Sequence, residues 1–339
     1  MTTEREITGP VDLCDGRGRL HTDARGWSRT PMLRANLRGR HGRKKRWDYW
    51  NVNTDEIVVS FVYADIDYAG LANVWVMAHG TDFQATSGVL KPLANGFTLP
   101  EHVCTGIVEY RDQSFRLRIE ETPSATHFVA TGNSPQGPID VQVEVAKPVG
   151  HESLNVVIPW SDRTFQFTSK QNSRPATGTV KVGDRSWTID ESHDAWGVQD
   201  LGRGVWPYSN RWNWAAASGH ADGRVVGLQF GGKWTVGTGA TENALCIDGH
   251  LTKISEELEW SYDWSNPMAP WRVRTPGSDQ VDVTLTPTFD RYDVTDLKVL
   301  RMEVHQCFGT WSGRIVDDDG VPLQINGIRG FAEEARNKW

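Results

Sequence analysis

Residues 187–243 read WTIDESHDAWGVQDLGRGVWPYSNRWNWAAASGHADGRVVGLQFGGKWTVGTGATEN, and they show most clearly how the chain folds. Two apolar runs of strand length, 211–219 and 224–232, flank Asp222-Gly223. An Asp-Gly pair between such runs is typical of a tight β-hairpin turn. Trp212 and Trp214 share one face of the first run, because alternate residues of a strand point the same way. The stretch therefore predicts an antiparallel hairpin.

The same pattern recurs along most of the chain. Further strands are expected at 57–66, 71–79, 114–120, 141–145, 281–286 and 297–316. Further turns are expected at Gly183-Asp184, Asp248-Gly249 and Asp319-Gly320. The final FAEEARNKW (331–339) is the one segment with a helical pattern. Many short strands with Gly-rich turns predict an all-β protein.

Twelve or more strands are too many for one small barrel, which closes at about eight. Two consecutive antiparallel β-barrels or sandwiches are therefore expected. The first would span residues 1–200 and the second residues 201–339, with the boundary in a polar loop before Trp206. Residues 1–46 are rich in Arg and Gly and are expected to form an extended arm over the first domain.

Composition excludes several classes of protein. A net charge of −7 disfavours nucleic acid as a partner. The basic run RGRHGRKKR (38–46) is either an anion site or a solvated surface. The four Cys form no C-x-x-C pair, no secretory signal is recognisable, and no apolar run is long enough to span a bilayer. The expected location is the cytoplasm.

The opening stretch also gathers aromatic and polar side chains. It contains six of the chain's 16 Trp, interleaved with ionisable and amide groups. Large rings beside convergent polar groups suit the wall of a ligand pocket, but they also suit a β core that needs wide side chains. The sequence leaves both interpretations open.

Several residues could carry acid–base chemistry. His193 and Asp194 are adjacent in a loop-like segment, and either they act together or the His is merely solvated. Asp200 could be a general acid in an apolar pocket, or it could pair with Arg203 to fix the local turn. Tyr208 could hold a ligand oxygen or lie in the core.

Two other groups of residues are less clear. Glu242 is either an exposed residue or a pocket carboxylate beside Asn243. Tyr63, Asp65 and Tyr68 form a second polar and aromatic cluster. No set of ligands with metal-binding spacing follows, and the usual nucleotide and metalloprotease motifs are missing, so neither a metal nor another cofactor is expected.

Three long segments resemble one bacterial family. They are HESLNVVIPWSDRTFQFTSKQNSRPATGTVKVGD (151–184), QDLGRGVWPYSNRWNWAAASG (199–219) and VGLQFGGKWTVGTGATENALCIDGHLTKI (226–254). GWSRTP (26–31) and KKRWDYW (44–50) resemble its opening motifs. This family is domain of unknown function 2804. It is more distantly similar to AttH-like and carotenoid-hydratase-like proteins, which are tandem lipocalin-like barrels of the calycin group.

The resemblance implies an apolar ligand and acid–base residues in a cavity between barrels. The leading hypothesis is a cofactor-independent hydratase that adds water to a C=C bond, or a related isomerase or cyclase. The alternatives are a non-catalytic carrier of a lipid or isoprenoid and a carbohydrate-binding protein. The expected catalytic residues are Asp200, Asp194, His193, Tyr208 and Glu242. The expected substrate-binding residues are Tyr63, Asp65, Tyr68, Lys170, Arg203, Trp206, Trp212, Asn213, Trp214, Gln229 and Asn243.

Overall fold

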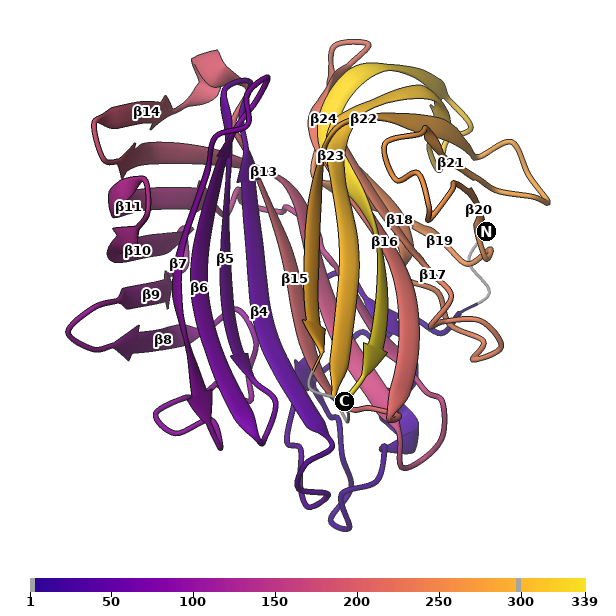
Figure 1. The fold of residues 1–339 in the computed structure, drawn as a ribbon. Helices are drawn as coiled ribbons and strands as arrows, with labels where there is room; N and C mark the ends of the chain where they lie inside the picture. Colours follow the sequence, from indigo (N-terminus) through magenta and orange to yellow (C-terminus); the bar gives the residue numbers. More distant parts are fainter. Residues whose placement is uncertain (1–3, 297–299) are drawn as a thin grey trace.

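The structure is a computed structural model that describes residues 4–296 and 300–339. It consists mainly of antiparallel β-strands, which form two strongly curled sheets side by side (Figure 1). Within those ranges there is no α-helix, only the 3-10 turns η1 (Thr22–Ala24) and η2 (Glu191–His193). The predicted all-β, two-barrel fold is confirmed. Each sheet is a half-barrel, because its strand order runs from one edge strand to another.

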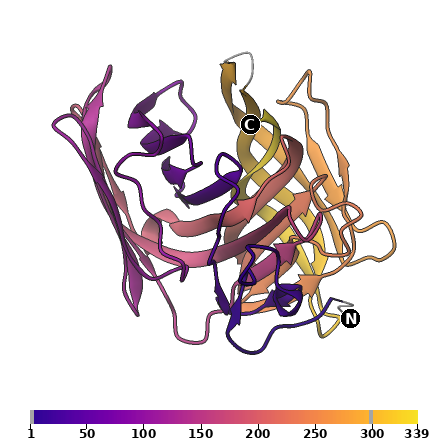
Figure 2. The same cartoon turned by 90° about the horizontal axis from the view of Figure 1, so that it is seen from below.

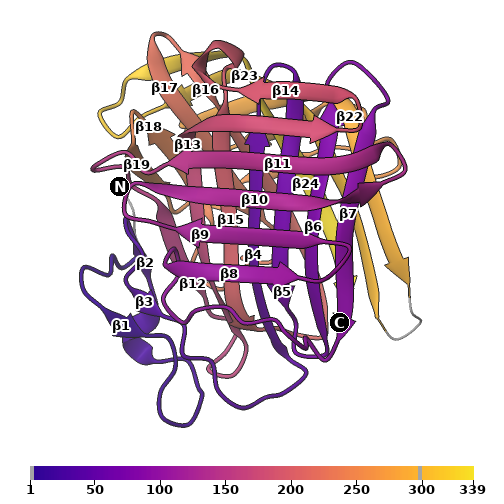
Figure 3. The same cartoon turned by 90° about the vertical axis from the view of Figure 1, so that its left-hand side faces the viewer.

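The first half-barrel follows the order β7-β6-β5-β4-β15-β13-β11-β10-β9-β8. Its strands are β4 (Lys44–Asn53), β5 (Ile57–Asp65), β6 (Ala69–Ala78), β7 (Gln84–Pro92), β8 (Gly106–Arg111), β9 (Arg116–Glu121), β10 (Ala125–Ser134), β11 (Gly137–Ala146), β13 (Phe165–Val182) and β15 (Trp196–Val205). Two further strands, β12 (Leu154–Ile158) and β14 (Arg185–Ile189), pair with β13. Figure 3 shows β8–β11 and β14 crossing over β4–β7, so the sheet folds back over its own core.

The second half-barrel follows the order β19-β18-β17-β16-β24-β23-β22-β21-β20. Its strands are β16 (Ser209–Ala221), β17 (Arg224–Gly232), β18 (Asn243–Ile247), β19 (His250–Ile254), β20 (Glu259–Ser261), β21 (Trp271–Arg274), β22 (Val281–Asp296), β23 (Arg301–Val316) and β24 (Pro322–Lys338). The predicted hairpin at Asp222-Gly223 joins β16 and β17. The strand expected from residue 297 is described from Arg301 onward, and residues 297–299 lie outside the described part.

Each half-barrel encloses its own apolar core. Phe61 stacks on Phe128 in the first, and Trp271 and Trp311 are fully buried in the second. Other apolar residues lie between the half-barrels, including Trp206. Because alternate residues of a strand face opposite ways, each central strand supplies both a core and the interface.

The N-terminal segment runs beneath both half-barrels, as Figure 2 shows from below. It contains β1 (Val11–Asp12) and β3 (Leu33–Arg34), which pair with each other, and β2 (Trp27–Ser28), which pairs with β12. Arg29 donates hydrogen bonds to Glu152 before β12 and to the carbonyl of Leu251 on β19. The segment therefore connects the two sheets.

Two expectations about local structure are wrong. The segment 331–339 is not a helix, because residues up to Lys338 belong to β24. Ala and Glu favour a helix, but pairing with β16 and β23 on both sides outweighs that preference. The polar loop expected before Trp206 is also a strand, since residues 196–205 form β15 between β13 and β4.

Candidate active site

A buried lysine joins two carboxylates across the interface. Lys170 Nζ, on β13, lies 2.7 Å from Asp200 Oδ1 on β15 and 2.8 Å from Glu242 Oε1, just before β18. The Lys170 ammonium also lies over the ring of Trp214, 4.2 Å from its centroid. Burial acts to lower the pKa of Lys170, but the two carboxylates outweigh it and raise that pKa. The side chain is therefore a cation at neutral pH, and it lies between the half-barrels.

Asp200 is held by further donors from its own sheet. Trp47 Nε1 donates to Asp200 Oδ2 over 3.1 Å, and the Thr168 hydroxyl donates to Oδ1 over 3.2 Å. Gly202 makes the first of these contacts possible, because a Cβ at that position would lie 2.3 Å from the Trp47 ring. The DLGRG segment thus supplies both the carboxylate and the space for its indole partner.

Glu242 is almost fully buried, with 2% of its side chain exposed. Trp234 Nε1 donates to Glu242 Oε2 over 3.1 Å. Gly231 lies directly beneath, where a Cβ would come within 2.4 Å of the same oxygen. Burial raises the pKa of Glu242 even though Lys170 acts to lower it. Of the two interpretations of Glu242 in the sequence, the structure favours a buried carboxylate.

A third carboxylate, Glu333 on β24, lies in the same interface. Trp212 Nε1 donates to its Oε1 over 2.8 Å, and Gln306 Nε2 donates to its Oε2 over 3.0 Å. Burial, with the nearby charge of Asp200, raises the pKa of Glu333 to about 7. A carboxyl group with that pKa can give or take a proton at neutral pH.

Indole rings cover one side of this cluster. Trp206 is their centre and stacks on Trp234, with ring centroids 5.5 Å apart. Its other ring contacts are Trp47, Trp160, Trp212 and Trp339. Three of these indoles donate to the carboxylates described above. The Trp-rich stretch therefore fills space and also holds charged groups in place.

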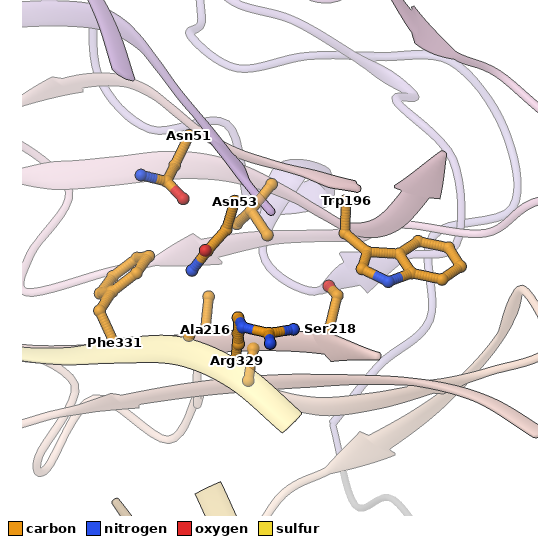
Figure 4. A pocket seen from close by; sticks show the side chains of 10 residues that line it. Asn51, Asn53, Trp196, Ala216, Ser218, Arg329 and Phe331 are labelled. Atoms are coloured by element: carbon orange, nitrogen blue, oxygen red, sulfur yellow. The ribbon is translucent and has the colours of Figure 1, made fainter. Parts of the chain in front are cut away.

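Two small cavities lie along the interface. One, about 10 Å³, is lined by Lys170, Asn172, Gln229 and Cys246 among others, which is room for about one water. The other, also about 10 Å³, lies toward the Trp196 end of β15 (Figure 4). Figure 4 shows Asn53, Arg329 and Trp196 around it. The interface therefore holds water-sized spaces beside its charged groups.

The fold brings together seven of the residues predicted from the sequence. They are Lys170, Asp200, Trp206, Trp212, Trp214, Gln229 and Glu242. Gln229 accepts from Trp214 Nε1 and donates to the carbonyl of Glu242, so it fixes both. They come from both sheets.

His193 and Asp194 have separate partners elsewhere. His193 Nδ1 lies 3.0 Å from Asp55 Oδ1, which raises the pKa of the imidazole. Asp194 accepts hydrogen bonds from Trp196 and Arg329 near the cavity of Figure 4. The structure therefore gives the two residues no joint acid–base geometry.

Arg203 does not pair with Asp200. Its guanidinium lies 2.8 Å from Asp48 inside the first half-barrel. Residues three apart in a strand face opposite sides, so Asp200 points to the interface and Arg203 points away from it. The segment from Asp200 to Arg203, which was expected to form a turn, belongs to strand β15.

The side chains of the polar and aromatic cluster predicted on the first domain contact other residues of the same chain. Arg46 pairs with Asp65 at 2.9 Å, and Lys45 lies over the ring of Tyr68. The Tyr63 hydroxyl donates to the carbonyl of Glu109 within the core. The basic run thus has carboxylate and aromatic partners. Among the described residues, no group of side chains is arranged to bind a metal.

Three other predicted residues lie outside the cluster. Asn213 faces the second half-barrel and donates to Tyr262. Asn243 accepts from the backbone of Gly231 and so fixes the strand next to Glu242. Tyr208 lies in the turn between β15 and β16 and is 45% exposed.

Sequence reasoning missed Glu333, Trp47 and Gln306. Glu333 was hidden because its segment has helical propensity. Phe331 and Glu333 share one face of the strand, but FAEEARNKW has no alternation that would have indicated it. Trp47 stands in KKRWDYW, where alternation with Tyr49 marks a strand face. Gln306 carries no pattern that distinguishes it from a surface residue.

The fold and this buried cluster define a protein of two half-barrels with an ionic centre between them. The chain belongs to the family described as "Domain of unknown function (DUF2804)", which it matches over residues 4–339. No curated protein matches it in sequence. No helix in the described ranges is long and apolar enough to cross a membrane.

Several solved structures have a similar chain path. CghA has 11% identity and a TM-score of 0.49, covering 91% of this chain and 95% of that chain. Kievitone hydratase from Nectria haematococca has 10% identity and a TM-score of 0.46, covering 86% and 88%. A putative AttH from Nitrosomonas europaea has 11% identity and a TM-score of 0.47, covering 86% and 92%. At these identities the likeness concerns the fold alone.

Proposed function

We propose that this protein is a cofactor-independent enzyme that adds water to a C=C bond of an apolar small molecule, or catalyses a related isomerisation or cyclisation. The observation that carries the proposal is Lys170 held between Asp200 and Glu242, with Glu333 in the same buried interface. Buried titratable groups with perturbed pKa values gather at catalytic sites more often than elsewhere.

Each group has a role in this proposal. For a C=C bond conjugated to a carbonyl, Lys170 stabilises the enolate oxygen that forms when water adds. Glu242 or Asp200 takes a proton from the attacking water, and Glu333 gives a proton to the neighbouring carbon. Proton transfer between the carboxyl groups restores the starting state. The Trp rings exclude solvent and face positive charge with their π surfaces.

The cavity beside Lys170 suits the water and not the organic substrate. Its volume of about 10 Å³ accommodates one water, whereas pockets for drug-sized molecules are typically about 300 Å³ or more. Turnover therefore requires the Trp206 cluster to open, which consists of Trp206 and the rings in contact with it, Trp47, Trp160, Trp212, Trp234 and Trp339. A substrate that is small on one side of its double bond requires the smallest opening of the Trp206 cluster.

The direct test incubates the protein with unsaturated apolar compounds in oxygen-18 water. A hydratase yields a product heavier than the substrate by one labelled water, and an isomerase or cyclase yields an unlabelled isomer. The proposal is wrong if neither appears for any compound that binds. Glu333→Gln, Asp200→Asn and Glu242→Gln should each slow turnover, by roughly 10²–10⁴-fold for the residue that transfers the proton.

The Trp206 cluster also favours one alternative, a non-catalytic carrier of a lipid or isoprenoid. A carrier uses the same indole surface but does not need Lys170 between two carboxylates. Binding that is unchanged in Glu242→Gln, with no product, would support the carrier.

A further inference from the structure

Arg174 is a buried cation placed by a distortion of β13. The pairing of β13 with β15 shifts register between Gln171 and Arg174, and Ser173 has a positive φ of 55°. A bulge of this kind re-aims the next side chain. Only 6% of Arg174 is exposed.

The guanidinium of Arg174 has unmet hydrogen-bonding capacity. Its Nε and Nη1 are buried and have no acceptor in the part of the chain that the structure describes. No carboxylate in the described ranges lies within ion-pairing distance of it. A buried charge of this kind is costly unless something pairs with it.

The carboxylate that acts on Arg174 already has partners. Glu121 lies 2.5 Å from Lys147 Nζ and accepts a hydrogen bond from Thr126 over 2.8 Å. One carboxylate therefore acts on two cations, Lys147 and Arg174. Burial lowers the pKa of Arg174, and Glu121 acts to raise it without direct contact.

The other neighbours are neutral. Burial raises the pKa values of Cys104 and Cys246 to about 12, so both are thiols at neutral pH. Burial lowers the pKa of His151, and the charge of Arg174 lowers it further, so the imidazole stays uncharged. Gln199, whose side-chain oxygen accepts from Cys104, has a buried Nε2 without an acceptor. None of these four side chains carries a negative charge.

We propose that the first half-barrel binds a small oxyanion at Arg174, with the Gln199 amide as a second donor. A carboxylate or a phosphate has the oxygen acceptors that a guanidinium matches, often two at a time. The site is separate from Lys170, whose own charge is balanced by Asp200 and Glu242. The inference goes beyond the proposed reaction and does not depend on it.

The test is thermal unfolding of the whole protein in phosphate or in acetate, at fixed pH and at an ionic strength maintained with sodium chloride. One of the two anions should raise the Tm of the wild type with saturation, by about 2–5 °C at concentrations well above Kd. Arg174→Met should abolish that rise. The anion that acts distinguishes a phosphate site from a carboxylate site.

Arg163→Met is the matched control, because it removes the same charge from an exposed turn and should leave the rise intact. Without oxyanion, Arg174→Met should melt at or above the wild-type Tm, because Met removes an uncompensated buried charge. No rise in the wild type, or an equal rise in Arg174→Met, overturns the proposal.

A second measurement decides the case in which Arg174→Met does not fold. Wild-type crystals soaked in the anion that raises the Tm should show that anion bound beside the Arg174 guanidinium. Ordered water alone at that position contradicts the site.

Discussion

The indole of Trp212 on β16 donates a 2.8 Å hydrogen bond to Glu333 on β24, the neighbouring strand. This bond favours the charged form of Glu333, yet burial still raises the pKa of that carboxyl group to about 7. The balance between the two effects brings the titration of Glu333 close to neutral pH, and it leads to the first prediction.

Glu333 should make stability fall as pH rises. Its pKa is higher in the folded protein than the usual 4.5, so its stabilising contribution is complete below that value and is lost as pH rises through about 7. The loss amounts to about 3 kcal/mol by pH 8. Glu333→Gln should remove this dependence, as measured by urea unfolding between pH 5 and pH 8. Equal slopes in the two proteins would show that Glu333 ionises normally.

Lys170→Met should destabilise the protein strongly, because Asp200 and Glu242 would remain buried without their cation. The expected loss is about 3–5 kcal/mol in the free energy of unfolding. Adding Asp200→Asn and Glu242→Gln should recover most of it. Lys91→Met is the control, since Lys91 pairs with Asp112 at the surface and should cost at most about 1 kcal/mol. A Lys170→Met protein as stable as that control contradicts the ion-pair assignment.

Gly231→Ala should displace Glu242. The new Cβ would lie 2.4 Å from Glu242 Oε2, and such overpacking costs about 1–3 kcal/mol. The cost should shrink in part when Glu242→Ala is present in the same chain, because the contact with Oε2 is removed whereas the 2.7 Å contact with the Cβ of residue 242 remains. A double-mutant cycle measures this change. Gly16→Ala is the control, because a Cβ there meets nothing within 4 Å. Additive effects of Gly231→Ala and Glu242→Ala would refute the contact.

The Arg203–Asp48 pair should matter for stability and not for turnover. Arg203→Met alone should cost about 3–5 kcal/mol, because it leaves Asp48 buried and unpaired, and the double variant with Asp48→Asn should cost less. Turnover per folded molecule should stay near wild type in the double variant. Asp200→Asn, on the opposite face of β15, should lose turnover while remaining folded. An equal loss of turnover in Asp200→Asn and in the double variant of Arg203 and Asp48 would show that Arg203 takes part in the reaction.

Local sequence pattern was sufficient for most of the fold. The alternation in 114–120 and the Asp-Gly turns at 222 and 248 predicted strands and hairpins correctly, because both depend on neighbours in the chain. The same reasoning failed at 331–339, where Ala and Glu favour a helix locally. Pairing with two flanking strands is a long-range interaction that no local propensity reports.

The chemistry of the interface was decided by tertiary structure. The sequence identified Asp200 and Glu242 as candidates because they stand in the Trp-rich stretch. Only the packing of two sheets brings Lys170 between them, and only strand direction separates Arg203 from Asp200. Charge pairing depends on distance in space. The sequence could therefore propose the carboxylates, but only the fold paired them with Lys170. The burial that raises the pKa of Glu333 is also a property of the fold.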